Sequence, residues 1–184
     1  MYTMTGGNFL IDADLILSKI HIHENMKIAD LGCGSSGHFV FPVAKMVGKT
    51  STVYAVDILK TILETINRKI RQDNIKNIKT VWSDLEIFGA TDIETSSLDV
   101  GFLINTLYQS KNRINIIRET IRMLKQGGSI IIIEWKNSSL PFGPPAEERV
   151  KEETLKIACQ KLGLKLEEEF MPGQYHFGLV YTKI

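Results

Sequence analysis

The chain has 184 residues, 43% hydrophobic and 23% charged, with a formal net charge of +1. This length is enough for a complete hydrophobic core, and the near-neutral balance gives no reason to expect nucleic acid or an anionic membrane as the main partner. Two cysteines, Cys33 and Cys159, are too few for a disulfide framework and favour a reducing, cytoplasmic setting. No apolar stretch is long enough to span a bilayer, and no secretory signal pattern is visible at the start.

Apolar spacing and β-branched runs predict helices and strands that alternate along the chain. We expect helices at residues 8–20, 36–47, 58–71, 113–124 and 147–162, and strands at 26–31, 52–57, 78–82, 98–104, 129–133, 165–171 and 177–183. Gly127 and Gly128 are expected to terminate the helix before the fifth strand. The alternation predicts one α/β domain over residues 1–184, a three-layer sandwich around a seven-stranded, mostly parallel sheet. The last two strands should form an antiparallel hairpin, because the chain between them is too short for a crossover helix.

A glycine-rich turn follows the first strand, in the run Asp30-Leu31-Gly32-Cys33-Gly34-Ser35-Ser36-Gly37. Gly32 and Gly34 can adopt turn angles that a side chain would penalise, and they let a ligand approach the backbone closely. Free amides at the start of the next helix favour a negatively charged group. The turn therefore predicts a site for an anionic or zwitterionic nucleotide-like ligand at the carboxyl end of the first strand.

These residues and the strand ends after them resemble the class I S-adenosylmethionine-dependent methyltransferase family, over nearly the whole chain. The run from Asp30 to Gly34 matches the first motif, Asp57 the acidic ribose-binding position, Asp84 the polar position near the adenine, and Asn105 the position after the fourth strand. The run Leu124-Lys125-Gln126-Gly127-Gly128 matches the turn before the fifth strand. The chain departs from the pattern at the third glycine, because Ser35-Ser36 puts Gly37 one position later than usual. The resemblance is greatest to small, single-domain members related to quinone-biosynthesis C-methyltransferases, which implies a Rossmann-like fold.

The resemblance implies S-adenosylmethionine as the cofactor. Asp30 can accept from its ammonium group, Asp57 from both ribose hydroxyls and Asp84 from the adenine amino group. Ile58 and Leu85 can flank the adenine ring. The full set of expected cofactor residues is Asp30, Gly32, Cys33, Gly34, Gly37, Asp57, Ile58, Asp84, Leu85 and Asn105. No metal is expected, because neither the histidines nor the cysteines have the spacing of metal ligands.

The end of the fourth strand, the end of the fifth and the hairpin turn should meet at the same edge of the sheet. That edge would bring together polar and aromatic residues suited to binding a substrate, namely Tyr108, Glu134, Trp135, Lys136, Tyr175 and His176. Tyr108 and His176 are the candidate catalytic residues, with His176 as a general base if the acceptor must lose a proton. A structural hydrogen bond in the hairpin is an equally good interpretation of His176. Residues 1–25 are expected to form a helical segment that covers the site.

The predicted function is an S-adenosylmethionine-dependent methyltransferase acting on a small molecule. One alternative is an NAD(P)-dependent oxidoreductase, since Gly32-x-Gly34-x-x-Gly37 with Asp57 about twenty residues later also satisfies the dinucleotide fingerprint. Asp30, Asp84 and the lack of room for a separate hydride-acceptor domain favour the methyl donor. A non-catalytic S-adenosylmethionine-binding protein is a second alternative.

Overall fold

The computed structural model describes residues 10–137 and 143–184, and its centre is a seven-stranded sheet in the order β3-β2-β1-β4-β5-β7-β6. Parallel pairing joins β3, β2, β1, β4 and β5, and β7 pairs antiparallel with both β5 and β6. The predicted mostly parallel sheet with a closing antiparallel hairpin is therefore confirmed. The strand bounds are Lys27–Leu31 (β1), Thr52–Asp57 (β2), Ile78–Trp82 (β3), Leu98–Ile104 (β4), Leu124–Trp135 (β5), Leu164–Gly173 (β6) and His176–Lys183 (β7).

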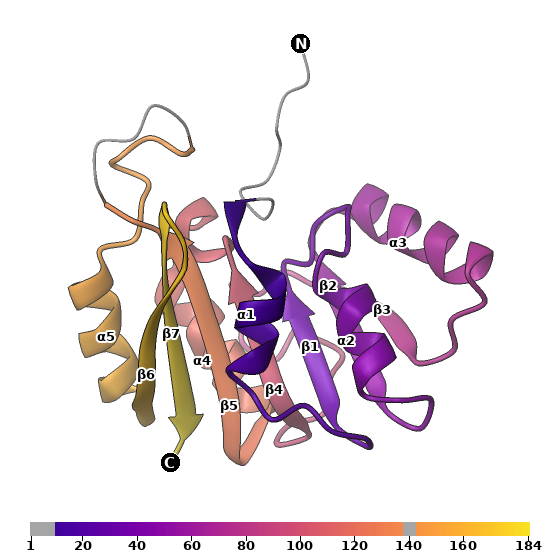
Figure 1. The fold of residues 1–184 in the computed structure, drawn as a ribbon. Helices are drawn as coiled ribbons and strands as arrows, with labels where there is room; N and C mark the ends of the chain where they lie inside the picture. The colour runs from indigo at the N-terminus through magenta and orange to yellow at the C-terminus, as the bar shows by residue number, and fades with distance from the viewer. Residues whose placement is uncertain (1–9, 138–142) are drawn as a thin grey trace.

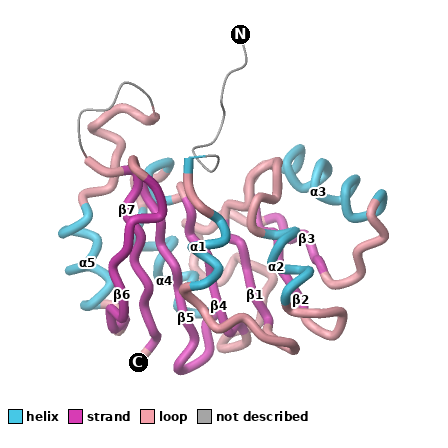
Figure 2. Tube along the Cα trace, viewed as in Figure 1, coloured by secondary structure: helices cyan, strands magenta, loops and turns pink. Residues whose placement is uncertain are grey.

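Helices cover both faces of the sheet and complete three layers (Figure 1). One face carries α1 (Ala13–Ser18), α2 (Val40–Met46) and α3 (Lys60–Gln72). The other carries α4 (Arg113–Met123), α5 (Glu152–Lys161) and the short 3-10 turn η2 (Leu107–Gln109). Figure 2 shows the connecting loops gathered at the two ends of the strands. The parallel strands all end at one of these edges, which is where ligands bind in open α/β sheets.

The central strands are buried on both faces, so their side chains alternate between two hydrophobic cores. In β1, Ile28 packs into the core beneath α1, α2 and α3, whereas Ala29 and Leu31 pack into the core beneath α4 and α5. The run Ile130 to Ile133 in β5 alternates in the same way, and all four side chains are fully buried. Cys159 lies in the α5 core, and burial raises the pKa of its thiol to about 11. These hydrophobic runs explain why the strands were recognisable from sequence.

The expected helix terminator at Gly127-Gly128 is wrong. Helix α4 ends at Met123, and β5 begins at Leu124, so both glycines lie inside the strand. Gly127 has a φ of 74°, and a Cβ on Gly128 would stand 3.0 Å from the Lys125 carbonyl oxygen. The pairing of β4 with β5 shifts register in this region, between Leu98 and Val100. The glycines therefore allow an irregularity in an extended chain, not the end of a helix.

Helices α1, α2 and α5 each begin four or five residues later than expected. Helix α1 begins at Ala13, because Asp12 is its N-cap and accepts from the Leu15 amide at 3.0 Å. Helix α2 begins at Val40, not near residue 36, so its amides do not start directly after Gly34. Helix α5 begins at Glu152, and a turn in which Glu148 donates to the Pro145 carbonyl precedes it.

The described part of the N-terminal segment is hydrogen-bonded to the tip of the final hairpin. The Asp12 amide donates to the Pro172 carbonyl at 2.8 Å, and a Cβ on Gly173 would stand 2.3 Å from the Leu10 carbonyl oxygen. Glycine at position 173 therefore allows this close approach. Residues 1–9 of the expected covering segment lie outside the described residues. Within the described ranges, no helix has both the length and the hydropathy needed to cross a membrane.

Candidate functional site

A cavity of about 290 Å³ lies at the carboxyl ends of the parallel strands, close to the lower end of ligand pockets, roughly 300 Å³. It brings together six of the expected cofactor residues with the 58–62, 83–86 and 106–110 segments. Its lining consists of Gly32, Gly34, Asp57, Ile58, Leu59, Ile62, Ser83, Asp84, Leu85, Glu86, Thr106, Gln109, Ser110 and Ile116. We call it the donor cavity.

The glycine turn forms one wall of the donor cavity. Gly32 has a φ of 86°, and a Cβ there would stand 2.7 Å from the Thr106 hydroxyl oxygen. That hydroxyl donates to the Leu31 carbonyl at 2.9 Å, so Thr106 locks the turn against the end of β4. Gly34 has a φ of 63°, and nothing lies within 4 Å of where its Cβ would be. A ligand can therefore approach the backbone at Gly34, while Gly32 is required by internal packing.

Asp57 ends β2 and presents its carboxylate to the donor cavity. Its Oδ2 accepts from the Gly34 amide at 3.2 Å and its Oδ1 from the Leu59 amide at 3.0 Å. These two bonds fix the carboxylate and leave further acceptor capacity, since each oxygen has two lone pairs. Ile58 beside it is 52% exposed, so an apolar surface lies next to a fixed acceptor.

The segment after β3 forms the opposite wall. Asp84, Leu85 and Glu86 all line the donor cavity, and Asp84 Oδ1 accepts from the Glu86 amide at 2.9 Å. Glu86 is joined to the segment after β4, because its carboxylate accepts from the Ser110 hydroxyl and the Asn112 side-chain amide, both at 2.6 Å. Glu86 therefore links the segment after β3 to the segment after β4.

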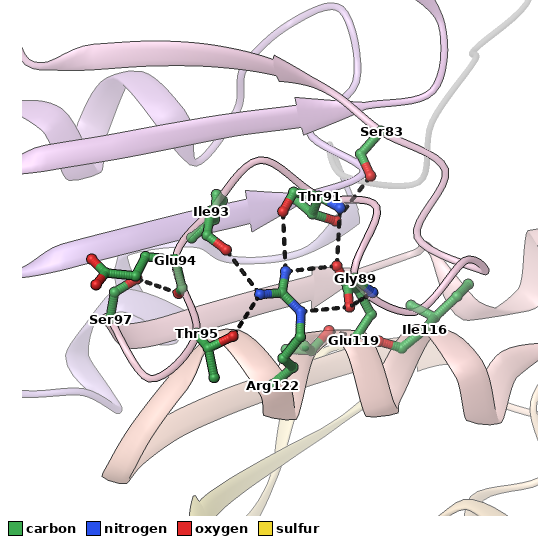
Figure 3. A network of polar contacts seen from close by, with 11 residues as sticks. Ser83, Gly89, Thr91, Ile93, Glu94, Thr95, Ser97, Ile116, Glu119 and Arg122 are labelled. Carbon is green, nitrogen blue, oxygen red and sulfur yellow. Dashed lines mark hydrogen bonds and ion pairs between the residues drawn. The ribbon is translucent and has the colours of Figure 1, made fainter.

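A buried ion pair on α4 holds the continuation of this segment (Figure 3). Glu119, fully buried, accepts from the Gly89 amide at 2.7 Å, the Thr91 amide at 3.1 Å and the Arg122 guanidinium at 2.8 Å. Arg122 in turn donates to the carbonyls of Thr91 and Ile93, both at 3.0 Å. Burial alone would raise the pKa of Glu119, but the bonds from Arg122, Gly89 and Thr91 lower it to about 2. Because the Thr91 hydroxyl also bonds to Ser83 at 2.9 Å, the network reaches the cavity lining.

Asp30 and Cys33 lie behind the glycine turn, outside the set of residues that line the donor cavity. Burial, and then the nearby charge of Asp57, raise the pKa of Asp30 to about 7. Burial, Asp30 and Asp57 raise the pKa of the Cys33 thiol far above its usual range. Cys33 is therefore an unreactive thiol, whereas Asp30 is a carboxyl group that a neighbouring cation would ionise.

Gly37 and Asn105 also lie outside the cavity lining. Gly37 has a φ of 56°, and a Cβ there would stand 2.5 Å from the Phe41 ring and 2.9 Å from Ile66. Packing against these side chains explains the glycine. Asn105 has a φ of 54° and is buried, and its carbonyl accepts from the Gln109 side chain at 2.8 Å. Asn105 thus shapes the turn whose next residue, Thr106, does line the cavity.

The residues expected at a common mouth divide between the two faces of β5. Successive strand residues point to opposite faces, so Glu134 lies on the α4 side and Trp135 on the α1 side. Glu134 Oε1 accepts from the amides of Leu107 at 2.6 Å and Tyr108 at 3.3 Å, and Glu134 Oε2 has no hydrogen-bond partner among the described residues. Burial raises the pKa of Glu134 to about 8, against the opposing effects of those amides and of Arg113.

His176 lies on the other face, against Trp135. The two residues are directly paired across β5 and β7, and their ring centroids are 4.2 Å apart. His176 is 0% exposed, and neither ring nitrogen has a hydrogen-bond partner in the described part of the chain. Burial, and then the charge of Lys136, lower the pKa of His176 to about 4, so the ring is neutral at physiological pH. Neither Tyr108 nor His176 lines the donor cavity.

Sequence reasoning missed Thr106, Gln109, Ser110 and Glu86, which line the donor cavity. Three of them follow the end of β4 within the same turn as Asn105, and Glu86 follows Asp84 by two positions. Their positions just after the ends of β3 and β4 could have indicated that they lie at the ligand edge of the sheet. The cavity therefore combines a fixed carboxylate, apolar side walls and an accessible glycine backbone, which together suit a nucleoside with a charged extension.

Comparison with known proteins gives matches to enzymes over most of the chain. A family model described as a methyltransferase domain matches residues 22–174. The chain is 28% identical over 123 residues to a demethylmenaquinone methyltransferase from Lactococcus lactis subsp. lactis (strain IL1403), covering 67% of this chain and 47% of that protein. It is 26% identical over 141 residues to the ubiquinone/menaquinone biosynthesis C-methyltransferase UbiE from Laribacter hongkongensis (strain HLHK9), covering 77% of this chain and 56% of that protein.

The chain thus spans about half the length of these curated relatives. Among solved structures, a SAM dependent methyltransferase from Aquifex aeolicus superposes with a TM-score of 0.85 at 23% identity, covering 97% of this chain and 93% of that one. At this identity the superposition shows the shared fold.

Proposed function

The chain belongs to the methyltransferase-domain family, and from this premise we propose that it transfers the methyl group of S-adenosylmethionine to a small-molecule acceptor. The observation that carries the proposal is the donor cavity, in which the Asp57 carboxylate, the open backbone at Gly34 and the apolar Ile58 and Leu85 face one space. These groups fit the parts of the cofactor. The carboxylate suits the ribose diol, the apolar side chains suit the flat adenine base, and the open backbone tolerates the close approach of the ligand.

Each residue has a binding or orienting role under this proposal. Asp57 accepts from the ribose hydroxyls, and Asp84 accepts from the adenine amino group. Asp30 is ionised when it holds the ammonium of the methionine end, because a nearby cation lowers the pKa of a carboxyl group. The cofactor supplies a methyl group already activated on a sulfonium, so the protein needs mainly to align the acceptor and exclude water.

For the acceptor, we propose a quinone- or quinol-type aromatic molecule, because the relatives named above are a demethylmenaquinone methyltransferase and a ubiquinone/menaquinone biosynthesis C-methyltransferase. His176 and Tyr108 remain our candidates for acting on it. A neutral imidazole can accept a proton, but a pKa of about 4 makes His176 a weak base and favours an orienting role. We also propose a cytoplasmic location, since both cysteines are free thiols.

The deciding experiment is calorimetric titration of the protein with S-adenosylmethionine, S-adenosylhomocysteine and NAD in parallel. We expect both adenosyl ligands to bind with affinities in the micromolar range, about −8 kcal/mol, and NAD to give no heat. Heat from NAD alone would instead support an oxidoreductase. Binding of S-adenosylmethionine without methyl transfer to a panel of demethylated quinols would exclude that acceptor class.

A further inference from the structure

We propose that a second cavity, between the start of α4 and the start of α5, binds an amphipathic anion, meaning a phosphate or carboxylate group on an apolar chain. Its volume is about 420 Å³, which exceeds that of the donor cavity. The two cavities share no lining residue. The second cavity is therefore not part of the site described above.

The charge around the second cavity is strongly one-sided. Its lining contains four cationic residues, Lys111, Arg113, Arg149 and Lys151, and one acidic residue, Glu147. The lining thus has a formal charge of +3, from four positive and one negative side chain, although the whole chain is only +1. For Lys111, Arg113 and Lys151, the described residues provide no carboxylate within ion-pair distance.

Main-chain carbonyls hold the two arginines in place. Arg113 Nε donates to the carbonyls of Leu107 and Ser110, both at 3.0 Å, and its Nη2 to the Glu148 carbonyl at 2.5 Å. Arg149 is 5% exposed, and its Nε donates to the Pro144 carbonyl at 2.9 Å. A carbonyl fixes a guanidinium without neutralising it, so an anionic group that enters here meets the pre-positioned positive charge of Arg113.

The inner part of the cavity is apolar. Ile117, Val150 and Leu155 line it and are 0%, 3% and 4% exposed. Ile114, also in the lining, is 43% exposed and leaves a large apolar side chain beside the cationic rim. A simple inorganic anion would leave the exposed Ile114 side chain uncovered, and a neutral apolar molecule would leave the charges uncompensated. A ligand with both parts satisfies both.

The test is titration of the full chain with octyl phosphate, hexyl phosphate, inorganic phosphate and the neutral amphiphile octyl glucoside, all below their micelle concentrations. We expect saturable binding of the alkyl phosphates, with an affinity that rises roughly fourfold for each buried methylene. Inorganic phosphate should bind much more weakly, and octyl glucoside should not bind. Equal affinity for octyl and inorganic phosphate, equal binding of octyl glucoside, or no saturable binding would each overturn the proposal.

Two variants locate the binding. The exposed lysines can be removed together as Lys111→Gln/Lys151→Gln, which should weaken octyl phosphate binding about three- to tenfold. The matched control is Lys76→Gln/Lys161→Gln, two exposed lysines outside this lining, which should leave it unchanged. Ile114→Asn should reduce the dependence on chain length. Equal loss in the control pair would show that general charge attraction, and not this cavity, accounts for the binding.

The same variants distinguish this proposal from the proposed function. S-adenosylmethionine should bind all of them as it binds the parent chain, because the altered residues do not line the donor cavity. Sedimentation with phosphatidylglycerol vesicles then identifies the source of the anion. Co-sedimentation that the Lys111→Gln/Lys151→Gln variant abolishes would point to a membrane lipid, and octyl phosphate binding without co-sedimentation to a soluble amphiphile.

Discussion

The Oε1 atom of Glu134 lies 2.6 Å from the main-chain nitrogen of Leu107, at the start of the turn that forms one wall of the donor cavity. The same oxygen accepts from the Tyr108 amide, so one buried carboxyl group fixes two donors of η2. Thr106 precedes this turn and holds the glycine turn in place. Glu134 therefore connects the end of β5 to the geometry of the cofactor site without lining it.

We predict that Glu134→Ala lowers the free energy of unfolding by about 1–3 kcal/mol, because it leaves the buried Leu107 amide and the part-buried Tyr108 amide without this acceptor. Glu134→Gln keeps an acceptor oxygen and should lose less. Denaturant unfolding at pH 7 measures both. Equal losses in the two variants would mean that side-chain volume, and not the acceptor, accounts for the effect.

A second prediction concerns Asp30 and pH. Its folded-state pKa of about 7 lies above the unfolded value of about 3.9, so the folded chain binds the extra proton between these values. The stability contribution is complete below the unfolded pKa and is lost as pH rises through about 7. Asp30→Asn imitates the protonated group, so it should stabilise the chain at pH 8 by about 1–4 kcal/mol and have little effect at pH 4.

Thermal unfolding at the two pH values checks this, with Asp73→Asn at an exposed position as the control. The same Asp30→Asn variant should bind S-adenosylmethionine more weakly, because it removes the charge that would hold the ammonium. Greater stability together with weaker binding is the signature of a residue kept for function.

A third prediction concerns Asp57. Hydrogen bonds to a charged group contribute about 1.5–3 kcal/mol each, so Asp57→Ala should weaken S-adenosylmethionine binding at least about tenfold. The variant also leaves the Gly34 and Leu59 amides without this acceptor, so its fold must be verified by circular dichroism before affinity is compared. Unchanged affinity in a folded variant would show that the ribose contact is assigned wrongly.

A fourth prediction concerns the buried pair of Glu119 and Arg122. Arg122→Ala leaves a fully buried carboxylate without its cation and should cost about 3–5 kcal/mol of stability. Because the folded pKa of Glu119 is lowered to about 2, its contribution is present above the unfolded pKa of about 4.3 and is lost as pH falls below it. Acid unfolding of the parent and of Glu119→Gln measures this. The control Glu153→Gln, in an exposed pair with Lys156, should change stability by less than about 1 kcal/mol.

A fifth prediction concerns His176. Because its pKa is lowered to about 4, its ring protons should not shift in NMR spectra recorded between pH 5.5 and 8, roughly the range in which an ordinary histidine titrates. The ring resonance of His176 is assigned as the one that is missing from the spectrum of His176→Gln. A midpoint near pH 6.5 would show that the ring is hydrated, and it would restore His176 as a conventional general base.

The strands were predictable because burial on both faces demands runs of β-branched and apolar residues. The bounds expected for residues 52–57, 78–82 and 98–104 are those of β2, β3 and β4. The first run ends in Asp57, and the other two are followed by Ser83 and Asn105, so each places a polar residue at the ligand edge. The predicted seven-stranded fold is confirmed by the sheet, and the predicted family by the methyltransferase-domain model that matches residues 22–174. Gly127-Gly128 was misjudged because glycine marks both helix ends and irregular strands, and only the pairing with β4 distinguishes the two.

The site was only partly predictable. Strand ends identified Asp57 and Asp84, but the role of Thr106 depends on a contact with Gly32, which lies far from it in sequence. Adjacent Glu134 and Trp135 were expected at one mouth, yet the alternation of β5 sends them to opposite faces. The sequence does not show which turn packs against which strand end, or which face of β5 lies toward the cavity, because both depend on contacts between distant parts of the chain.

Both native thiols are buried, and burial raises their pKa, so they form little of the thiolate that reacts with maleimides or iodoacetamide. The natural chain is consequently close to a cysteine-free background for chemical labelling. A single cysteine introduced at an exposed position such as Phe88 or Lys111 would be the preferred site for a fluorophore or spin label. A cysteine at each of these two positions then lets the distance between the donor side and the second cavity be followed in an otherwise native sequence.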